Sequence, residues 1–282
     1  MGRESNERNL SSPHPHQAKD DESYVWTAHS RATGHSVGIT REGHVLTWGR
    51  SNRLGQLGRP TATKTKIKSS SSSVDATTTK ATQPGLAVFE GRTTVRGVRA
   101  YAGGSADAGH TAVIDQDGDL WMAGCDRWQQ LGLGSSMLGA TGYTWKALYQ
   151  TTFQRNDFVR AHLRELDPTA TIRDVAIGGD HTIVLSSNGR DVIAFGKGGE
   201  GQLGLHQKCF VSAPMKSKYL SSSERGKISA VCAFDNCSAA LSPKGEILSE
   251  AGKCHRTQSL LQSLVECRKE ARLAGLLSDD SR

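Results

Sequence analysis

The chain has 282 residues, with 35 Lys and Arg against 28 Asp and Glu and a formal net charge of +7 at pH 7. With 36% hydrophobic residues and 31 glycines, it can bury one sizeable core rich in turns. No apolar run is long enough to cross a membrane as a helix, which excludes a helical membrane protein. Residues 1–23 are polar and are predicted to be a disordered tail rather than a secretory signal. We therefore expect a cytoplasmic or nuclear protein without membrane contact.

Three segments repeat one pattern, and a fourth repeats it weakly. A histidine opens an apolar segment, a glycine follows eight positions later, and a second apolar segment leads to another glycine and a Gln-Leu-Gly turn. The repeated positions are His35, Gly43, Trp48, Gly49 and Gly58; His110, Gly118, Gly124 and Gly132; His181, Gly189, Gly196 and Gly204; and, in the fourth copy, Gly245 and Gly252, with Cys237 in the histidine position. Repeats of this kind must stack on one another to bury their apolar sides.

Each copy is predicted to form a small antiparallel sheet of three strands. In chain order the predicted strands are 37–40 and 45–48; 98–102, 111–114 and 120–123; 172–177, 182–185 and 192–195; and 228–233, 238–241 and 247–248. Asp117-Gly118 and Asn188-Gly189 are strong hairpin signals, because glycine accepts the positive φ that a tight turn needs. The whole region is therefore predicted to be all-β.

These residues resemble a known family, the regulator of chromosome condensation repeats, which build β-propellers. The family pattern of Gly and His, a strand, Asp-Gly, a strand ending in Trp-Gly and a Gly-Gln-Leu-Gly turn is met at positions 34 to 58. The copies at 109–132 and 179–204 keep most of it, and the fourth keeps its spacing. The resemblance implies a β-propeller or partial propeller of about four antiparallel blades over residues 24–253.

The number of blades does not match the family. Members that exchange nucleotide on the small GTPase Ran form a closed ring of seven blades. Here the steps from His35 to His110 and from His110 to His181 leave room for long loops but not for further blades. An open arc would expose strand edges. The arc is then capped, pairs with a second protein, or belongs to a longer propeller.

Two insertions interrupt the repeats. Residues 59–94 are rich in Ser, Thr and Lys and are predicted to be a flexible insertion, because so few apolar side chains cannot offset the ordering of the backbone. Residues 135–168 are predicted to be a partly helical insertion, with short helical pieces at 145–149 and 158–166 that stop at Pro168. Aromatic residues of this second insertion are expected to pack on the adjacent blade.

Residues 254–282 are predicted to form a C-terminal helix and tail. The apolar residues fall mostly at steps of three and four, as an amphipathic helix requires: Leu260, Leu261, Leu264, Val265, Leu273, Leu276 and Leu277. We expect this helix to cover the propeller's own edge rather than to bind another protein.

No catalytic, cofactor-binding or metal-binding residue is predicted. The histidines recur at one place in every copy, which favours a hydrogen bond inside each blade over several active sites. Asp115, Asp117 and Asp119 alternate across a turn, but the rest of a calcium loop is missing. The six cysteines contain no Cys-x-x-Cys pair, so they are expected to be reduced thiols rather than zinc ligands.

Two functions are compatible with these observations. The first is a non-catalytic protein-protein interaction module, which a rigid repeat with variable loops suits well. The alternative is a guanine-nucleotide exchange factor-like regulator of a small GTPase, which the family resemblance implies. Basic residues in 59–99 and at Arg155, Arg160, Arg164 and Arg173 are interpreted as a solvated face, with contact to DNA, chromatin or histones as the alternative.

Overall fold

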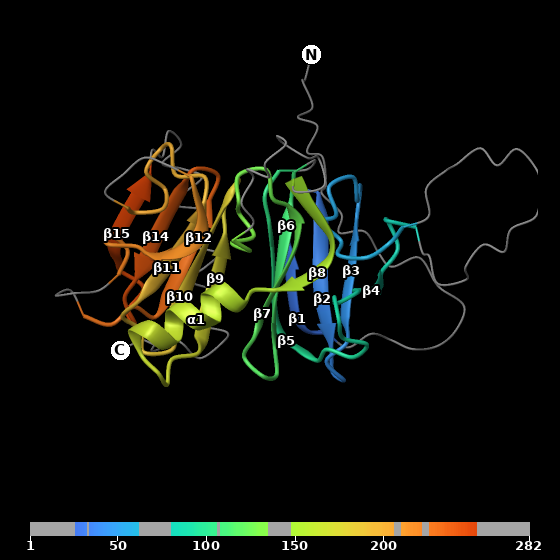
Figure 1. The fold of residues 1–282 in the computed structure, drawn as a ribbon, viewed down its shortest axis with the longest axis horizontal. Coiled ribbons are helices and arrows are strands. Elements are labelled where there is room, and N and C mark those ends of the chain that lie inside the picture. Colours follow the sequence, from blue (N-terminus) through green and yellow to red (C-terminus); the bar gives the residue numbers. More distant parts are fainter. Residues whose placement is uncertain are drawn as a thin grey trace, which may run out of the picture.

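The fold consists of four antiparallel sheets that stand side by side (Figure 1). The computed structural model describes residues 26–32, 34–61, 80–105, 108–134, 148–205, 210–221 and 226–252. The predicted N-terminal tail and the predicted C-terminal helix lie outside these residues. The all-β prediction is confirmed, and each repeat corresponds to one sheet, which we call blades 1 to 4 in chain order.

The strands follow one another across each blade without a crossover. Blade 1 contains β1 (Trp26–Arg31), β2 (His35–Thr40), β3 (Val45–Gly49) and β4 (Gly85–Leu86), and blade 2 contains β5 (Gly97–Gly103), β6 (His110–Asp115), β7 (Leu120–Cys125) and β8 (Tyr149–Arg155). Blade 3 contains β9 (Ile172–Ile177), β10 (His181–Ser186), β11 (Val192–Gly196) and β12 (Val211–Lys216), and blade 4 contains β13 (Ala230–Phe234), β14 (Cys237–Leu241) and β15 (Ile247–Gly252).

Blades 1 to 3 have four strands, so the prediction of three strands per copy was wrong for them. Two of the three fourth strands, β4 and β8, come from residues that were expected to be insertions, and the third, β12, follows the Gln-Leu-Gly turn of blade 3. The first two were missed because β4 has two residues and β8, at the outer edge, is mostly polar and only half-buried. In particular, Tyr149 begins a strand, whereas a helical piece was expected at 145–149.

The second strand of each blade is buried, and in blades 2 and 3 a neighbouring blade packs on either side of it. β2, β6 and β10 are buried along their whole length. Three apolar clusters lie between neighbouring blades, one at each of the three junctions. The first strands β1, β5, β9 and β13 contact one another in series, so they form the inner edge of the arc.

Residues 80–94 are part of blade 1 and its junction with blade 2, so the expectation of a flexible loop was wrong there. The Phe89 ring stacks on Phe153 with centroids 5.0 Å apart and meets the Trp121 ring edge-on at 5.2 Å. The backbone N–H of Phe153 donates to the Val88 carbonyl, and that of Glu90 donates to the Phe153 carbonyl. Three aromatic rings therefore bring the end of the first insertion and the strand of the second together.

The described helix, α1 (Asp157–Leu166), confirms the helical piece expected at 158–166. Its N-terminus is capped by Asn156, whose side chain accepts from the Val159 N–H at 2.9 Å. Val159 and Leu163 are buried in the cluster between blades 2 and 3. The helix ends before Pro168, and it contacts β7 and β12 (Figure 1).

Candidate interaction surface

The repeated histidines join one blade to the next. His35 Nε2 lies 2.8 Å from the Thr111 hydroxyl of blade 2. That hydroxyl donates at 2.6 Å to the carbonyl of Gln56, in the Gln-Leu-Gly turn of blade 1. Since the hydroxyl hydrogen is used on Gln56, the histidine must donate its Nε2–H to the threonine oxygen. This relay, which we call the histidine staple, fixes the tautomer of His35.

The full relay is repeated at the next junction, and its histidine–hydroxyl contact is repeated at the third. His110 Nε2 lies 3.0 Å from the Thr182 hydroxyl, which donates to the Gln130 carbonyl at 2.8 Å. His181 Nε2 lies 2.7 Å from the hydroxyl of Ser238. The sequence placed these histidines inside single blades, and that interpretation was wrong, because the acceptor in each case belongs to the following blade.

Burial keeps all three histidines neutral. It lowers the pKa of His35 from 6.5 to about 4 and the pKa of His110 and of His181 to about 3. Each Nδ1 atom is buried without a hydrogen bond, as expected for a ring whose proton sits on Nε2. A ring that is neutral at physiological pH and aimed at a buried hydroxyl is a structural group rather than a base for catalysis.

Removing one staple hydroxyl should weaken the propeller measurably. In Thr182→Val, the His110 Nε2–H and the Gln130 carbonyl both lose a buried partner, which should lower the free energy of unfolding by about 2 kcal/mol. Urea unfolding followed by tryptophan fluorescence would measure the change. Thr152→Val is the matched control, because the Thr152 hydroxyl is not fully buried: it donates to Glu90 at an exposed site and accepts from Gln154. Equal stability of the two variants would contradict the staple.

The repeated glycines occupy positions that side chains could not fill. The hairpin glycines Gly43, Gly118, Gly189 and Gly245 and the turn glycines Gly58, Gly132 and Gly204 all have positive φ. Gly49, Gly124, Gly196 and Gly252 pair in register with His35, His110, His181 and Cys237. A Cβ at Gly124 would lie 2.6 Å from the Gly109 carbonyl oxygen, so the backbones approach too closely for any side chain. Trp48 is half-buried and pairs with Ser36.

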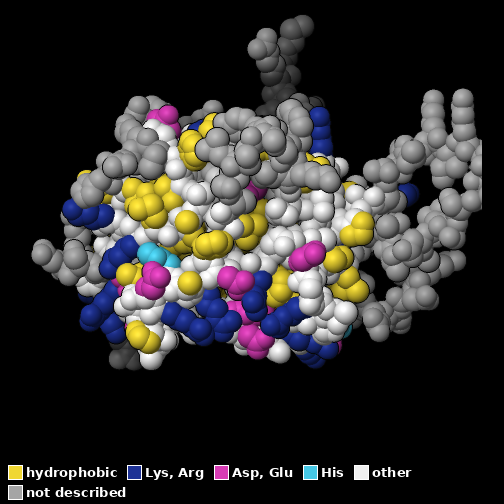
Figure 2. All heavy atoms as spheres, viewed as in Figure 1, with side chains coloured by type: hydrophobic (Ala, Val, Ile, Leu, Met, Phe, Trp, Pro, Cys, Tyr) yellow, Lys and Arg dark blue, Asp and Glu magenta, His cyan; other side chains and the backbone are white. Residues whose placement is uncertain are grey.

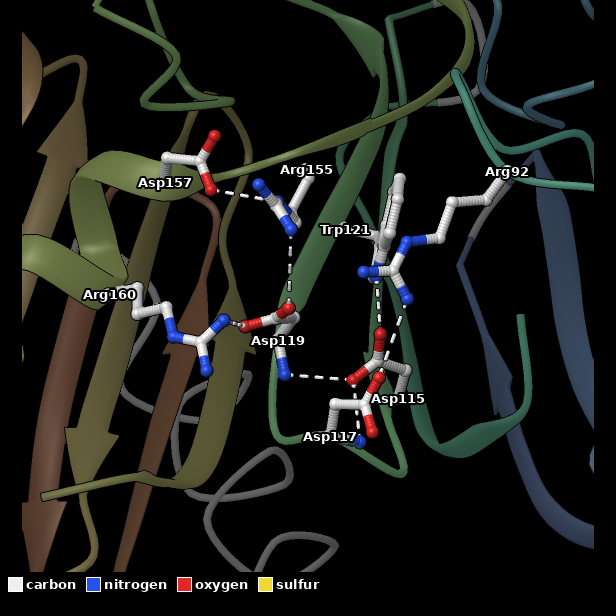
Figure 3. Close-up of polar contacts among 8 residues, drawn as sticks. All are labelled: Arg92, Asp115, Asp117, Asp119, Trp121, Arg155, Asp157 and Arg160. Carbon is white, nitrogen blue, oxygen red and sulfur yellow. Dashed lines mark hydrogen bonds and ion pairs between the residues drawn. The ribbon is translucent and has the colours of Figure 1, made fainter. Parts of the chain in front are cut away.

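The acidic hairpin of blade 2 is an internal cap (Figure 3). The Asp115 carboxylate accepts from the backbone N–H groups of Asp117 and Asp119 at 3.0 and 2.9 Å, and from Trp121 Nε1 at 2.8 Å. These are the alternating aspartates that resemble a calcium loop in sequence. Asp115 is buried and its oxygens face N–H donors, so they are already engaged by the protein itself.

Two arginines of the predicted basic set also meet this hairpin. Asp119 accepts from Arg160 Nη1 at 2.6 Å and lies 3.8 Å from Arg155 Nη1, while Arg155 also pairs with Asp157 at 2.8 Å (Figure 3). Burial raises the pKa of the Asp119 carboxyl, and Arg160 acts in the opposite direction. Arg155 and Arg160 remain 38% and 40% exposed, and they also pair with acidic residues of the hairpin and of α1.

The hairpins lie at one end of the blades, which we call the hairpin face. In Figure 2 basic side chains gather along the lower edge of the molecule, with acidic side chains between them. Arg92, for example, pairs with Asp117 at 3.4 Å and lies over the Trp121 ring. Charges of both signs therefore lie along this edge in the view of Figure 2.

The opposite end, which we call the loop face, carries the turns that follow the inner strands. A pocket of about 370 Å³ opens there, and every blade contributes to it through Ala32, Gly104, Gly178 and Asp235, one from each. Ile177 and Phe234 supply apolar walls, and Phe234 remains 39% exposed. Among the lining residues that the structure describes, Asp235 is the one charged residue, so this part of the lining is acidic in a basic protein.

Further charged and aromatic groups stand beside this pocket. Lys197 Nζ lies 3.8 Å from Asp180 and 5.3 Å from the Trp128 ring, a cation–π contact. Burial raises the pKa of Asp180, and the nearby Asp235 carboxylate raises it too, while Lys197 lowers it. None of these residues was singled out from the sequence. The paired glycines Gly103-Gly104 and Gly178-Gly179 were the available signal, because they mark loops that approach each other closely.

The inner strands are joined by polar contacts that the sequence also did not indicate. The Tyr101 hydroxyl donates to Asp174 at 3.1 Å, and Arg99 donates to the Arg173 carbonyl. Burial raises the pKa of Asp174 to about 6. These contacts link blades 2 and 3 along the inner edge of the arc.

Within the described residues, no group of three or more His, Cys, Asp or Glu could hold a metal ion. Cys125, Cys232 and Cys237 are buried and form no disulfide. No helix of the described ranges has the length and apolar character needed to span a membrane.

Serial four-stranded antiparallel blades around an inner edge define a β-propeller. Residues 172–202 match the family model of the regulator of chromosome condensation (RCC1) repeat. The chain thus carries an RCC1 repeat within a propeller fold, and the resemblance to RCC1-repeat propellers seen in its sequence is confirmed.

Two curated proteins are similar in sequence. The chain is 27% identical over 226 residues to Protein RCC2 homolog of Danio rerio, covering 75% of this chain and 39% of that protein. It is 34% identical over 138 residues to the X-linked retinitis pigmentosa GTPase regulator of Canis lupus familiaris, covering 49% and 12%. The chain therefore spans less than half the length of either relative.

Two solved structures share the fold. Human WBSCR16 superposes with a TM-score of 0.57 and 18% identity, covering 80% of this chain and 48% of that chain. Prp20p from Saccharomyces cerevisiae, which was studied for its binding to Gsp1p and histones, superposes with a TM-score of 0.55 and 19% identity, covering 81% and 46%. In both cases the match is to about half of the larger propeller.

Proposed function

We propose that the chain is a non-catalytic protein-protein interaction module whose loop face receives a partner protein. The observation that carries the proposal is the pocket to which all four blades contribute one loop. The staples and buried clusters hold these loops on a rigid scaffold, so little ordering is needed when a partner binds.

The pocket's chemistry indicates what the partner presents. Phe234 and Ile177 offer apolar surface, and the Asp235 carboxylate enters no ion pair within the described residues. A lysine or arginine side chain of the partner could lay its methylene groups on the apolar walls and place its charge beside Asp235. The exposed Trp128 at the same face adds an aromatic contact of the kind that is enriched in binding sites.

The alternative function is exchange-factor-like regulation of a small GTPase, with chromatin contact as a further candidate. It is favoured by two similar proteins: a GTPase regulator among the relatives, and Prp20p, studied with Gsp1p and histones, among the structures. In both functions the chain would act in the cytoplasm or nucleus and would form no covalent intermediate. The chain covers 46% of Prp20p, so exchange activity is the less direct proposal.

Direct binding and nucleotide release would separate the two functions. The full chain would be tested against purified small GTPases loaded with labelled GDP, and against core histones, by surface plasmon resonance and by GDP release. Stable binding without faster GDP release would support the interaction module. Accelerated release would instead establish the exchange factor. Absence of binding to any of these proteins would remove the support for the GTPase and histone partners.

The loop face should carry the binding energy. Phe234→Ala combined with Asp235→Ala should lower the affinity for the captured partner at least about tenfold, because the double substitution removes the apolar wall and the carboxylate. The matched control is Phe158→Ala with Asp157→Ala, an exposed Phe and its neighbouring Asp on α1. Titration calorimetry would compare the two. Equal affinity of both double variants would place the partner elsewhere on the molecule.

A further inference from the structure

The last blade has one face turned toward blade 3 and one turned away. Ser238 receives the staple of His181, and Val231 and Ala240 belong to the cluster shared with blade 3. Because side chains alternate along a strand, their neighbours point to the opposite side. This second side, which we call the outer face of blade 4, consists of Ala230, Cys232, Phe234, Cys237, Ala239 and Leu241, which pair across β13 and β14.

The outer face of blade 4 is apolar, and most of it is closed to solvent. Phe234, at the loop end, is 39% exposed, whereas each of the other five residues is at most 4% exposed. Yet the main contacts of the strands β13 and β14, among the described elements, are with one another, with β15 and with the strands of blade 3. An apolar face of this size at the end of an arc would be exposed if nothing lay on it, so its burial requires a cover.

A further blade of the same repeat does not suit this face. In blades 1 to 3 the staple histidine reaches the next blade from this position, whereas blade 4 has Cys237 there. A thiol is a weak donor and too short to span the distance that the imidazole covers. Small residues such as Ala239 and Cys232 instead leave a flat surface on which a helix can lie closely.

We propose that the chain caps its own propeller: residues 257–277 form an amphipathic helix that packs on the outer face of blade 4. The chain leaves β15 at Gly252, directly beside this face. A helix of this length would extend about 30 Å, which exceeds the length of about 20 Å expected for strands of five or six residues. The chain supplies the apolar stripe in Leu260, Leu261, Leu264 and Val265.

The other candidate covers fit less well. Residues 1–23 are polar and provide no comparable apolar stripe. A second copy of the chain would have to leave its own stripe at 257–277 uncovered while burying the face of its neighbour. The cap buries the apolar stripe and the outer face of blade 4 against each other within one molecule. It does not depend on the proposed function of the loop face.

The two cysteines on this face allow a direct test. In a full-length background with Cys209→Ser, Cys254→Ser and Cys267→Ser, the remaining thiols are Cys125, Cys232 and Cys237. Leu260→Asp with Leu264→Asp should expose Cys232 and Cys237 and speed their reaction with a thiol reagent at least about tenfold. Ser259→Asp with Ser263→Asp puts the same charges on the polar side of the predicted helix and should leave the rate unchanged.

Cys125 is the internal reference, because it is buried in blade 2, far along the chain from the cap. Mass spectrometry of labelled peptides should find Cys232 and Cys237 modified while Cys125 stays protected. Unchanged protection of Cys232 and Cys237 in the Leu260 and Leu264 variant would overturn the proposal. Similar exposure in the serine variant would overturn it as well.

Cross-linking decides the case in which the leucine variant unfolds as a whole. In the same background, Leu264→Cys should form an intramolecular disulfide with Cys232 or Cys237 on mild oxidation, and Ser263→Cys should not. Peptide mapping under non-reducing conditions would identify the bridge. A disulfide between two molecules would assign the cover to a second copy, and absence of any bridge would count against the helix on this face.

Discussion

Replacing Asp115 with alanine is expected to destabilise the fold by about 4 kcal/mol, because three N–H donors lose one buried acceptor. Two of these donors are backbone groups of the turn, and the third is the indole of the buried Trp121. Water cannot enter to replace the carboxylate without opening the junction between blades 1 and 2. Urea denaturation with tryptophan fluorescence would give the change in the free energy of unfolding.

Asp117 supplies the control two residues along the same hairpin. It is exposed and pairs only with the exposed Arg92, so Asp117→Ala should cost less than about 1 kcal/mol. Calcium added to the wild-type protein should not raise its stability, because the Asp115 oxygens are already engaged by N–H donors. A calcium-dependent increase, or equal losses at Asp115 and Asp117, would disprove the capping role.

Acidification is expected to weaken the propeller through its neutral histidines, and His181→Gln should reduce this effect. The folded-state pKa of His181 is lowered to about 3, whereas the unfolded chain titrates near 6.5. Below pH 6.5 the unfolded state therefore binds a proton that the folded state excludes, and stability falls as the pH falls. Above pH 6.5 the contribution is fully present.

For one such histidine the loss between pH 7 and pH 5 is about 2 kcal/mol. His35 and His110 act in the same direction. Asp174 acts in the opposite one, because its pKa is raised to about 6 and its carboxyl gains a proton more readily in the folded state. The difference between wild type and His181→Gln isolates a single ring from these other groups.

The measurement is the free energy of unfolding in urea at pH 7, 6 and 5 for both proteins. Glutamine keeps an N–H donor for Ser238, so the variant should remain folded at pH 7. The wild type should lose about 2 kcal/mol more than the variant over this range. Parallel pH profiles would mean that His181 is accessible to protons in the folded state.

The repeat pattern predicted the hairpins correctly because each is encoded locally. Apolar runs on either side of Asp117-Gly118 or Asn188-Gly189 specify a turn and two strands within about a dozen residues. The outer strands could not be predicted in this way. β4 becomes a strand only because β3 offers a free edge, and β8 is mostly polar because one of its edges faces solvent.

The candidate site depends on contacts between residues far apart in the chain, so less of it was predictable. The histidine positions were clear from spacing, but the direction of their hydrogen bonds follows from how blades stack. The pocket combines Ala32 with Asp235, which no local pattern relates. Arg160 could be assigned to Asp119 only after α1 was placed against blade 2.

The staples also determine how cooperative this protein can be. Each staple connects two adjoining blades. The four blades are therefore coupled through three interfaces in series, as in a one-dimensional chain of units. In a closed ring, two neighbouring blades whose junction is broken remain connected through the other blades. In an open arc, loss of the middle junction separates two halves that must survive independently, which makes His110 the point where the molecule would divide.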